Sequence, residues 1–369
     1  METELLRGAL IGTGSIAQYH LTAWQRVPGV RIDALCNRTI EKARAMGQRF
    51  NISDDHIYSD LDDLLAHEPN LNFVDIATAP DLHRVQTETA ARRGLHVLCQ
   101  KPLAPSLADA QAMLAACRAA GVLLSVNENW RWRGWYRQVQ QHLQQGAIGR
   151  LRYVRITNHH NLTLERVDGS RPPLFERQAY TRDMPHLLLF EWGIHVIDTL
   201  RMLLGDPQWV QAHMAHVSPL CAGEDRALLL LGFGEVVACL DLSWASHVPE
   251  GPPSLLEEAL FEGDGGSLAL IPNRGDGDSL RLVRPLPREQ VPVDRDRAWS
   301  PVVTQTWPAH DGDLAAAYQA SYDAAHRHFI DCLRAGRLPE THAGDNLKTL
   351  RTMFAAYQSA AENRSVTLE

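Results

Sequence analysis

A glycine-rich turn near the start of the chain, Gly12-Thr13-Gly14-Ser15-Ile16-Ala17, limits the possible folds more than any other feature of the sequence. It follows the apolar run 5–11 and precedes a segment with helical character, which is the setting of the G-x-G-x-x-G/A fingerprint. Gly12 permits a tight turn, Gly14 lets the backbone approach a pyrophosphate, and Ala17 lets the helix lie close to the strand. The free N–H groups of the helix N-terminus then face the phosphates. The turn therefore predicts a βαβ unit that binds a dinucleotide.

The first third of the chain alternates short apolar runs with helical stretches. Strands are predicted at 5–11, 31–37, 73–78, 96–100 and 123–128, and helices at 15–26, 39–50, 61–67, 82–93 and 107–120. This alternation is typical of a doubly wound parallel sheet with helices on both faces, in which a ligand binds across the carboxyl ends of the strands. We therefore predict a dinucleotide-binding Rossmann domain over residues 1–128.

The pattern changes after about residue 130. Successive strands separated by turns predict a mostly antiparallel sheet, with strands at 152–157, 209–217, 227–231, 236–243, 259–262, 267–271 and 279–283. One apolar helix is predicted at 184–204, loops with short edge strands at 272–312, and two final helices at 314–335 and 343–362. A chain of 369 residues is long enough for two domains. We predict a second, α+β domain over residues 129–369.

Composition disfavours several classes of protein. With 36 basic and 44 acidic residues the formal net charge is −8, which disfavours nucleic-acid partners and anionic membrane surfaces. No apolar stretch approaches the roughly 20 residues that span a bilayer. The acidic start Met1-Glu2-Thr3-Glu4 lacks the basic segment of a signal peptide, so we expect a cytoplasmic protein. Six scattered cysteines without a C-x-x-C pair predict buried thiols: Cys36, Cys99, Cys117, Cys221, Cys239 and Cys332.

The end of the second predicted strand bears on the choice of cofactor. The residue about 20 positions after the third small residue of the turn normally contacts the adenosine ribose. Here it is Asn37, followed by Arg38, so the acid that selects NAD is absent. An asparagine still hydrogen-bonds a hydroxyl, and an arginine pairs with a 2′-phosphate or stacks on adenine. The sequence leaves NAD and NADP open, and it also leaves open that both residues form only a solvated turn.

Lys101 directly follows the fourth predicted strand, within Cys99-Gln100-Lys101-Pro102. Pro102 biases Lys101 to extended geometry, which directs its side chain at the ligand end of the sheet. An ammonium at this place is suited to hold a substrate oxygen and to stabilise a developing alkoxide. The alternative is a lysine that only reaches solvent.

A second cluster lies in the apolar segment 184–204. On an α-helix, Glu191, His195 and Asp198 fall within about 60° of one another, so three polar groups share one stripe. Burying them unpaired costs several kcal/mol, so they must face partners or a cavity. Glu191 and His195, four residues apart, can hydrogen-bond, which orients the imidazole as a general base requires. A histidine whose hydrogen bonds are satisfied within the core is the alternative.

Tryptophans and arginines crowd the segment 127–136. They suit a sugar pocket, where rings stack on C–H faces and polar groups bind hydroxyls, or equally a contact between two domains. The remaining histidines match no metal-ligand spacing with a carboxylate in register, so no metal is assigned: His159, His160, His213, His216, His326 and His328.

In their order and spacing these motifs resemble the glucose–fructose oxidoreductase and inositol dehydrogenase (Gfo/Idh/MocA) family over essentially the whole chain. The matching motifs are Gly12-x-Gly14-x-x-Ala17, Thr78-Ala79-Pro80 with Leu82-His83, Lys101-Pro102 and Gly193-x-His195-x-x-Asp198. The family implies a Rossmann domain and a second domain with an open, predominantly antiparallel sheet, through which copies form homodimers or homotetramers. It also implies pyridine-nucleotide redox chemistry on a sugar or polyol.

The resemblance implies roles for individual residues. Lys101 matches the active-site lysine, His195 the catalytic histidine, and Glu191 the carboxylate four residues before it. The implied substrate contacts are Lys101, Asn129, Trp130, Asn158, Glu191 and His195. The implied cofactor contacts are Gly12, Thr13, Gly14, Ser15, Ile16, Asn37, Arg38, Thr78, Ala79, Pro80, His83, Gln100 and Lys101.

Two positions depart from the family pattern. The usual Glu-Lys-Pro is here Gln100-Lys101-Pro102, so the lysine lacks a neighbouring negative charge. The usual aspartate before the histidine is Glu191, which is one methylene longer. Both substitutions, together with the segment 127–132, resemble the D-apiose dehydrogenase branch of the family.

The sequence thus predicts an NAD(P)-dependent dehydrogenase in which His195 takes a hydroxyl proton and Lys101 stabilises charge on the same oxygen. A cyclic aldose such as D-apiose would give a lactone. Two alternatives stay open: an NAD-dependent glycosidase of the same fold with transient redox and no net NADH, and a nucleotide sensor without catalysis. Specificity is expected in the loop 163–183, which carries Arg166, Arg171, Arg177, Tyr180 and Arg182.

Overall fold

The computed structural model describes residues 5–247, 257–272, 278–286 and 302–368. Two compact units make up the chain, Met1–Trp132 with Tyr318–Arg351 and Arg133–Ala317 with Thr352–Glu369. The acidic start Met1-Glu2-Thr3-Glu4 and part of the predicted loop 272–312 lie outside the described residues. Within the described ranges, no helix has both the length and the apolarity needed to cross a bilayer.

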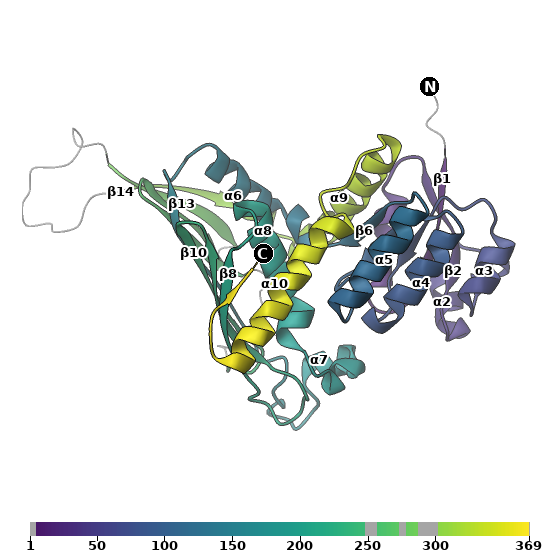
Figure 1. The fold of residues 1–369 in the computed structure, drawn as a ribbon, viewed down its shortest axis with the longest axis horizontal. Coiled ribbons are helices and arrows are strands. Elements are labelled where there is room, and N and C mark those ends of the chain that lie inside the picture. The colour runs from purple at the N-terminus through teal and green to yellow at the C-terminus, as the bar shows by residue number, and fades with distance from the viewer. Residues whose placement is uncertain (1–4, 248–256, 273–277, 287–301, 369) are drawn as a thin grey trace, which may run out of the picture. The chain divides into compact units, whose positions relative to one another are not determined.

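The first unit contains a parallel sheet, in which the described strands run in the order β3-β2-β1-β4-β5-β6. Its strands are β1 (Leu6–Ile11), β2 (Val30–Cys36), β3 (Ile57–Tyr58), β4 (Phe73–Ile76), β5 (His96–Gln100) and β6 (Leu124–Asn127). Helices alternate with them along the chain (Figure 1): α1 (Ala17–Gln25), α2 (Ile40–Phe50), α3 (Leu61–His67), α4 (Pro80–Arg92) and α5 (Leu107–Ala119). The predicted doubly wound sheet is thereby confirmed, with β3 as an additional strand.

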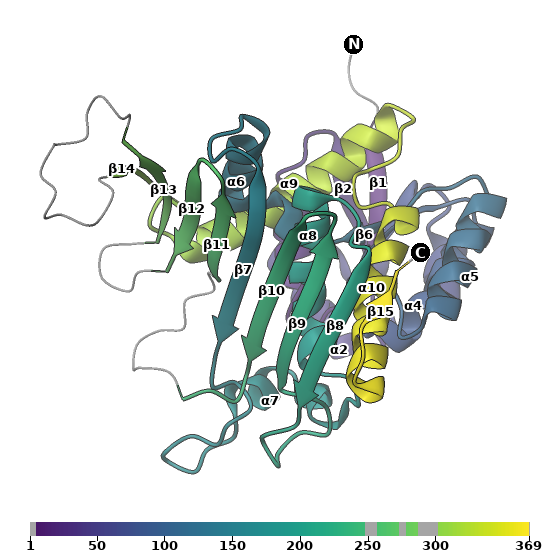
Figure 2. The same cartoon turned by 60° about the vertical axis from the view of Figure 1, so that its left-hand side comes forward.

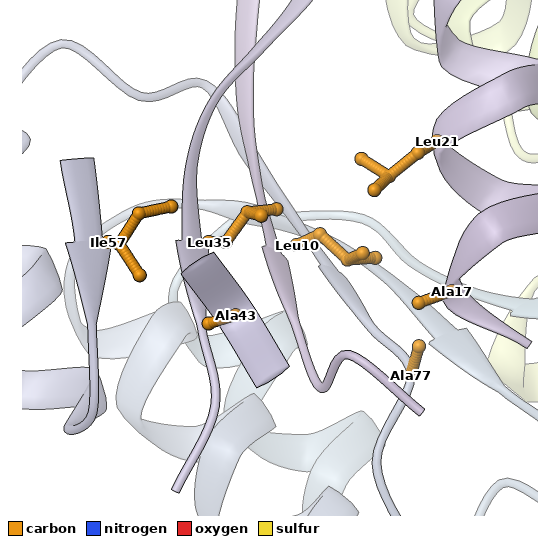
Figure 3. Close-up of a cluster of buried hydrophobic side chains, with 7 residues drawn as sticks. All are labelled: Leu10, Ala17, Leu21, Leu35, Ala43, Ile57 and Ala77. Atoms are coloured by element: carbon orange, nitrogen blue, oxygen red, sulfur yellow. The ribbon is translucent and has the colours of Figure 1, made fainter. Parts of the chain in front are cut away.

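An apolar core lies beneath the glycine-rich turn. Figure 3 shows Leu10 of β1, Leu35 of β2 and Ile57 of β3 beside side chains of the flanking helices: Ala17, Leu21, Ala43 and, from the loop after β4, Ala77. Ala17 is fully buried and Ala77 is 6% exposed. Small side chains at both places let the start of α1 approach the end of β4, as the third position of the fingerprint predicts.

The second unit contains a larger sheet, in which the described strands run in the order β14-β13-β12-β11-β7-β10-β9-β8-β15 (Figure 2). β7 and β10 are parallel, and the other described neighbours are antiparallel. The strands are β7 (Leu151–His159), β8 (Trp209–Ala215), β9 (Arg226–Phe233), β10 (Val236–Ser243), β11 (Glu258–Gly263), β12 (Gly266–Ile271), β13 (Ser279–Pro285), β14 (Val302–Pro308) and β15 (Val366–Thr367). This confirms the predicted α+β class with a mostly antiparallel sheet.

One face of this sheet carries helices. Figure 2 shows α6 (Gly134–Gln144) and α8 (Ile194–Leu204) behind the strands β7 to β10, and α7 (Pro173–Arg177) lies in the long connection between β7 and α8. The buried residues of the strands alternate accordingly, as in β9. The two last helices, α9 (Leu314–Arg334) and α10 (Ala343–Glu362), lie where the sequence predicts them, and each contributes residues to both units.

The cysteines agree with the prediction of thiols. All six are free, and five of them are buried. Burial raises the pKa of the Cys36 thiol to about 12 and that of the Cys117 thiol to about 12.

Candidate active site

The glycine-rich turn connects the carboxyl end of β1 to α1. Gly12 has a φ of +96°, and a Cβ built there would lie 2.6 Å from the carbonyl oxygen of Ala77, so this position requires glycine. A Cβ on Gly14 would meet no atom within 4 Å, so the backbone is open there. The buried hydroxyl of Thr13 has no hydrogen-bond partner among the described residues. An open backbone beside an unsatisfied hydroxyl, at the start of a helix, fits a bound pyrophosphate. The next two residues of the turn are Ser15, which is exposed, and Ile16, which is half-buried and precedes α1.

Asn37 has a structural role that the sequence analysis did not anticipate. Its Oδ1 accepts the N–H of Thr13 at 3.1 Å, and its Nδ2 donates to the carbonyl of Thr39 at 2.8 Å. The amide therefore joins the end of β2 to the glycine-rich turn. Arg38 is exposed next to it. A contact of either residue with the adenosine end of a cofactor stays a prediction.

A buried histidine ties together the loops after β4 and β5. His83 of α4 is fully buried, with Nδ1 3.1 Å from the carbonyl oxygens of Pro102 and Leu103 and Nε2 3.1 Å from that of Thr78. Burial lowers the pKa of His83, although these carbonyls act in the opposite direction. The peptide bond before Pro102 is cis. His83 thus supports two loops at the ligand edge of the sheet, and its predicted contact with a cofactor stays untested. Between Thr78 and α4, Ala79 is exposed, and Pro80 is the first residue of the helix.

Lys101 follows β5 at the same edge of the sheet as the glycine-rich turn. Ile11 of β1 pairs with Ile76 of β4, which pairs with Cys99 of β5, so the residues that follow these strands lie side by side. The backbone N–H of Lys101 donates to Oε1 of Gln100 at 2.6 Å, and the lysine side chain is half-buried. The first unit therefore carries the turn and the predicted active-site lysine on one edge.

Glu191 and His195 lie where a π-helical turn, Leu189–Gly193, passes into α8. The sequence predicts one α-helix over 184–204, and this prediction is wrong in two respects. The helical segment begins at Leu188, and the π turn changes the 100° spacing between Glu191 and His195. Glu191 is half-buried and His195 is 6% exposed. π turns inside α-helices occur frequently at functional sites.

A buried carboxylate, Glu224, binds the start of this helical segment. Its Oε2 accepts the N–H of Leu187 at 3.0 Å, and its Oε1 accepts the N–H of Leu189 at 2.9 Å and the hydroxyl of Tyr357 at 2.7 Å. The first N–H groups of a helix have no partner within it, and an anion there is favourable. Burial and the charge of Glu224 raise the pKa of Tyr357. The sequence does not indicate Glu224 as a functional residue, because no local pattern places the loop before β9 beside this helix.

The inner face of the second sheet places Asn158 near the same segment. Asn158 of β7 pairs with Leu242 of β10, and a Cβ built on Gly193 would lie 3.1 Å from Leu242 Cδ1. Asn158 is 4% exposed, and its Oδ1 has no hydrogen-bond partner in the described ranges. A buried, unsatisfied amide oxygen costs free energy unless a ligand or water meets it. Asp198 of α8 is 1% exposed and lies 3.8 Å from Arg201.

The segment 127–136 is largely buried. In the first unit, Trp130 is 2% exposed and the Asn129 amide donates to the Ser321 hydroxyl at 2.7 Å. In the second unit, Arg133 forms a buried ion pair with Glu257 at 2.7 Å. The structure thus gives several of these residues packing and hydrogen-bonding roles. The predicted substrate contacts of Asn129 and Trp130 stay predictions.

The predicted specificity segment 163–183 includes α7 and a 3₁₀ turn, Ala179–Asp183. Arg166 pairs with Glu176 at 3.1 Å. Partial burial and the charge of Glu191 raise the pKa of the Tyr180 hydroxyl. The other arginines of the segment are exposed: Arg171, Arg177 and Arg182.

The chain is similar to known proteins over nearly its whole length. An oxidoreductase family with an NAD-binding Rossmann fold matches residues 6–128, and the GFO/IDH/MocA C-terminal domain matches residues 136–269. A D-apiose dehydrogenase of Paraburkholderia graminis is 38% identical over 98% of this chain and 90% of its own length. A D-apiose dehydrogenase of Rhizobium rhizogenes is 32% identical over 98% of this chain and 97% of its own.

A solved structure supports the same relationship. The crystal structure of an oxidoreductase from Agrobacterium radiobacter, in complex with NAD+, L-tartaric acid and magnesium, has a TM-score of 0.85 to this chain at 31% identity. The match covers 99% of this chain and 98% of that one. The parallel sheet with its glycine-rich turn, the mostly antiparallel sheet and these full-length matches lead to one conclusion. The chain belongs to the Gfo/Idh/MocA family of NAD(P)-dependent oxidoreductases.

Proposed function

We propose that the protein is a dehydrogenase that oxidises a hydroxyl of a sugar or polyol, with an aldose such as D-apiose, converted to its lactone, as the best-supported substrate. The observation that carries the proposal is the position of Lys101, half-buried beside the glycine-rich turn on one edge of the first sheet. The similarity to two D-apiose dehydrogenases over 98% of the chain supports the choice of sugar.

In the proposed reaction, His195 accepts the hydroxyl proton while Glu191 keeps the imidazole oriented. Lys101 donates a hydrogen bond to the same oxygen and stabilises its negative charge as the C–H bond breaks and the carbonyl forms. A bound nicotinamide supplies the acceptor for the hydride. Asn158, with its unsatisfied buried oxygen, would bind a neighbouring hydroxyl.

The cofactor-binding part of the proposal uses one edge of the first sheet. The backbone from Gly12 to Ile16 would bind the pyrophosphate, and the loop from Thr78 to Pro80, supported by His83, would contact the nicotinamide half. Arg38 would stand at the adenosine end. Since an asparagine replaces the acid that selects NAD, we expect both NAD and NADP to bind.

A substrate panel tests the proposed reaction. Purified protein is incubated with NAD+ or NADP+ and with free sugars, polyols and glycosides, and reduced nicotinamide is followed by absorbance. Accumulation with a free aldose, D-apiose first, is the expected result. Release of sugar from a glycoside without reduced nicotinamide would establish the glycosidase instead. Binding of nucleotide without turnover of any compound would establish the sensor.

Two variants test the residues. Because an apolar side chain cannot stabilise the oxyanion, Lys101→Met should lower kcat about 100- to 1000-fold with NADH affinity retained. Lys42→Met, which removes an exposed lysine of α2, is the matched control. His195→Asn should flatten the acidic limb of the pH–rate profile. Full turnover in Lys101→Met, or an unchanged limb in His195→Asn, would remove the residue concerned from the mechanism.

We also propose that copies of the chain associate through the outer face of the second sheet. Leu228 and Leu230 of β9 are 45% and 37% exposed on that face. Neighbouring large apolar side chains that remain exposed are typical of an interaction surface.

A further inference from the structure

A chain of hydrogen bonds runs through the core of the first unit and ends at the backbone of Lys101. His20 of α1 and Asp75 of β4 are fully buried, and Gln100 of β5 is 7% exposed. His20 Nδ1 lies 2.8 Å from Asp75 Oδ2, and His20 Nε2 lies 3.0 Å from Gln100 Nε2. Gln100 Oε1 in turn lies 2.6 Å from the backbone nitrogen of Lys101. The proposed function uses Lys101, but neither His20 nor Asp75.

The donors in this chain can be assigned from its Lys101 end. A backbone N–H only donates, so the Gln100 atom that faces Lys101 must be the oxygen. The Gln100 atom that faces His20 is then the NH2 group, which also only donates. His20 Nε2 must therefore accept, and the ring hydrogen is on Nδ1, where it is donated to Asp75. The geometry thus requires a neutral His20 with a single N–H.

The other neighbours are consistent with this assignment. Trp24 Nε1 donates to Asp75 Oδ2 at 2.7 Å, so this oxygen accepts from two N–H groups. Asn127 Nδ2 lies 3.3 Å from His20 Nε2 and, like the NH2 group of Gln100, only donates, so both neighbours require Nε2 to accept.

We propose that His20 and Asp75 are positioning residues for Lys101. Asp75 fixes the tautomer of His20, His20 orients the amide of Gln100, and Gln100 holds the backbone N–H of Lys101. The proposal rests on the proposed function in that it takes Lys101 as catalytic. The proposal also explains why a glutamine precedes the lysine. The carboxylate of a glutamate at position 100 could not donate a hydrogen bond to His20 Nε2, so His20 would have to carry a second proton and donate instead.

A metal site is the alternative interpretation of this cluster, because His20 and Asp75 lie beside a third potential metal ligand, His326. One atom each of His20, Asp75 and His326 lie within 4.8 Å of one another, with His326 Nε2 3.5 Å from Asp75 Oδ2. The N–H groups of Trp24 and His20 already occupy this oxygen. Two N–H donors at this oxygen favour a hydrogen-bonded carboxylate over a metal site.

The tautomer is measured in the unmodified protein. Long-range ¹H–¹⁵N correlation spectra of histidine-labelled protein distinguish the Nδ1–H form, the Nε2–H form and the imidazolium, and the signal that disappears in His20→Asn assigns His20. We expect the neutral Nδ1–H form in the wild type and the imidazolium in Gln100→Glu. The Nε2–H form or the imidazolium in the wild type, or a metal bound to Nδ1, would overturn the proposal without any measurement of activity.

Two replacements of His20 separate positioning from packing. Asparagine places its amide near Nδ1 and keeps the donor to Asp75, whereas glutamine places it near Nε2 and keeps an acceptor for Gln100. With NAD+ and D-apiose, His20→Asn should lower kcat about 10- to 100-fold with NADH affinity unchanged, since a small displacement of a catalytic group has this effect. His20→Gln should retain more of kcat than His20→Asn.

His326→Gln is the matched control. His326 is as deeply buried as His20 and also faces Asp75, and its Nδ1 bonds the carbonyl of Tyr322. We expect a lower melting temperature with kcat within about twofold of the wild type. The proposal fails if His20→Asn turns over like the wild type, or if kcat only follows melting temperature across the three variants. Wild-type turnover in Lys101→Met would instead refute the proposed function.

Discussion

Two glycines of one motif meet different physical constraints. At Gly12 the constraint is internal, because φ is positive and any side chain would strike the backbone of Ala77. At Gly14 the protein itself leaves room for a side chain, so the constraint comes from outside the chain. The proposed pyrophosphate site explains why this position is nevertheless a glycine.

This difference predicts different outcomes for the same substitution. Gly12→Ala should destabilise the protein by about 1–3 kcal/mol, because it combines a strained φ with a steric clash. Gly14→Ala should keep the wild-type melting temperature but weaken NADH binding at least about tenfold, which is ~1.4 kcal/mol. Thermal unfolding and fluorescence titration with NADH measure the two effects. Wild-type NADH affinity in Gly14→Ala would argue against a pyrophosphate at this turn.

Single residues also differ in how far the sequence reveals them. Lys101 is recognised because it directly follows a predicted strand, and the strand is found. Asn37 is recognised by its distance from the turn, but its hydrogen bond to Thr13 depends on how two loops meet. His20, Asp75 and Gln100 come from three elements far apart in the chain, so no local pattern connects them.

At the scale of elements, the segment that carries Glu191 and His195 depends on a distant anion. Glu224 bonds two backbone N–H groups at the start of this segment, so it replaces the partners that a helix end lacks. The local sequence predicts a helix from residue 184. The structure begins it at Leu188 and adds a π turn, since contacts made by other elements set the start.

Glu224→Gln tests this dependence. An amide has one acceptor atom where the carboxylate has two, so one of the N–H groups is left unsatisfied, at a cost of about 1–3 kcal/mol. We expect a lower melting temperature and a lower kcat, because the segment that carries His195 moves. Tyr357→Phe, which removes only a hydroxyl bonded to the same carboxylate, is the milder control and should keep most of kcat. Full kcat in Glu224→Gln would show that the hydrogen bonds of Glu224 to the start of the helical segment do not determine the position of His195.

The sequence did not predict the elements β3 and α6. β3 has two residues, Ile57 and Tyr58, which is too short for a pattern of alternation. α6 (Gly134–Gln144) overlaps only the end of the aromatic and basic segment 127–136, whose composition does not by itself indicate a helix. The parallel pairing of β7 with β10 was also not predicted, because strand order within a sheet is a long-range property.

At the scale of the whole molecule, one strand of the second sheet leaves apolar side chains exposed on the face opposite its buried residues. In the second sheet, β9 buries Ala227, Leu229 and Leu231 and leaves Leu228 and Leu230 exposed. The alternation of side chains along a strand explains why every second residue is buried, but it does not explain why the exposed residues Leu228 and Leu230 are apolar. Association of copies through this face is the reason that we propose.

A charge on this face should prevent the association. Leu228→Arg is expected to yield monomers, because an arginine placed in an apolar interface without a partner is costly. Size-exclusion chromatography with light scattering measures the mass of the wild type and the variant. Leu338→Arg, at an apolar residue of the first unit that is 61% exposed, is the control and should keep the wild-type mass. An unchanged mass in Leu228→Arg would place the interface elsewhere.

The sequence by itself determined the features that depend on near neighbours in the chain. These are the alternation of strands and helices, the glycine-rich turn, the change from a parallel to a mostly antiparallel sheet and the position of Lys101 after its strand, because periodicity and turn chemistry act over a few residues. Only the tertiary structure decided which groups meet across long separations in the sequence. These are the chain of hydrogen bonds from Asp75 through His20 to Gln100, the hydrogen bonds of Glu224 to the helix start, and the pairing of Asn158 with Leu242. Such contacts depend on the packing of whole elements, to which many residues contribute and which no single segment encodes.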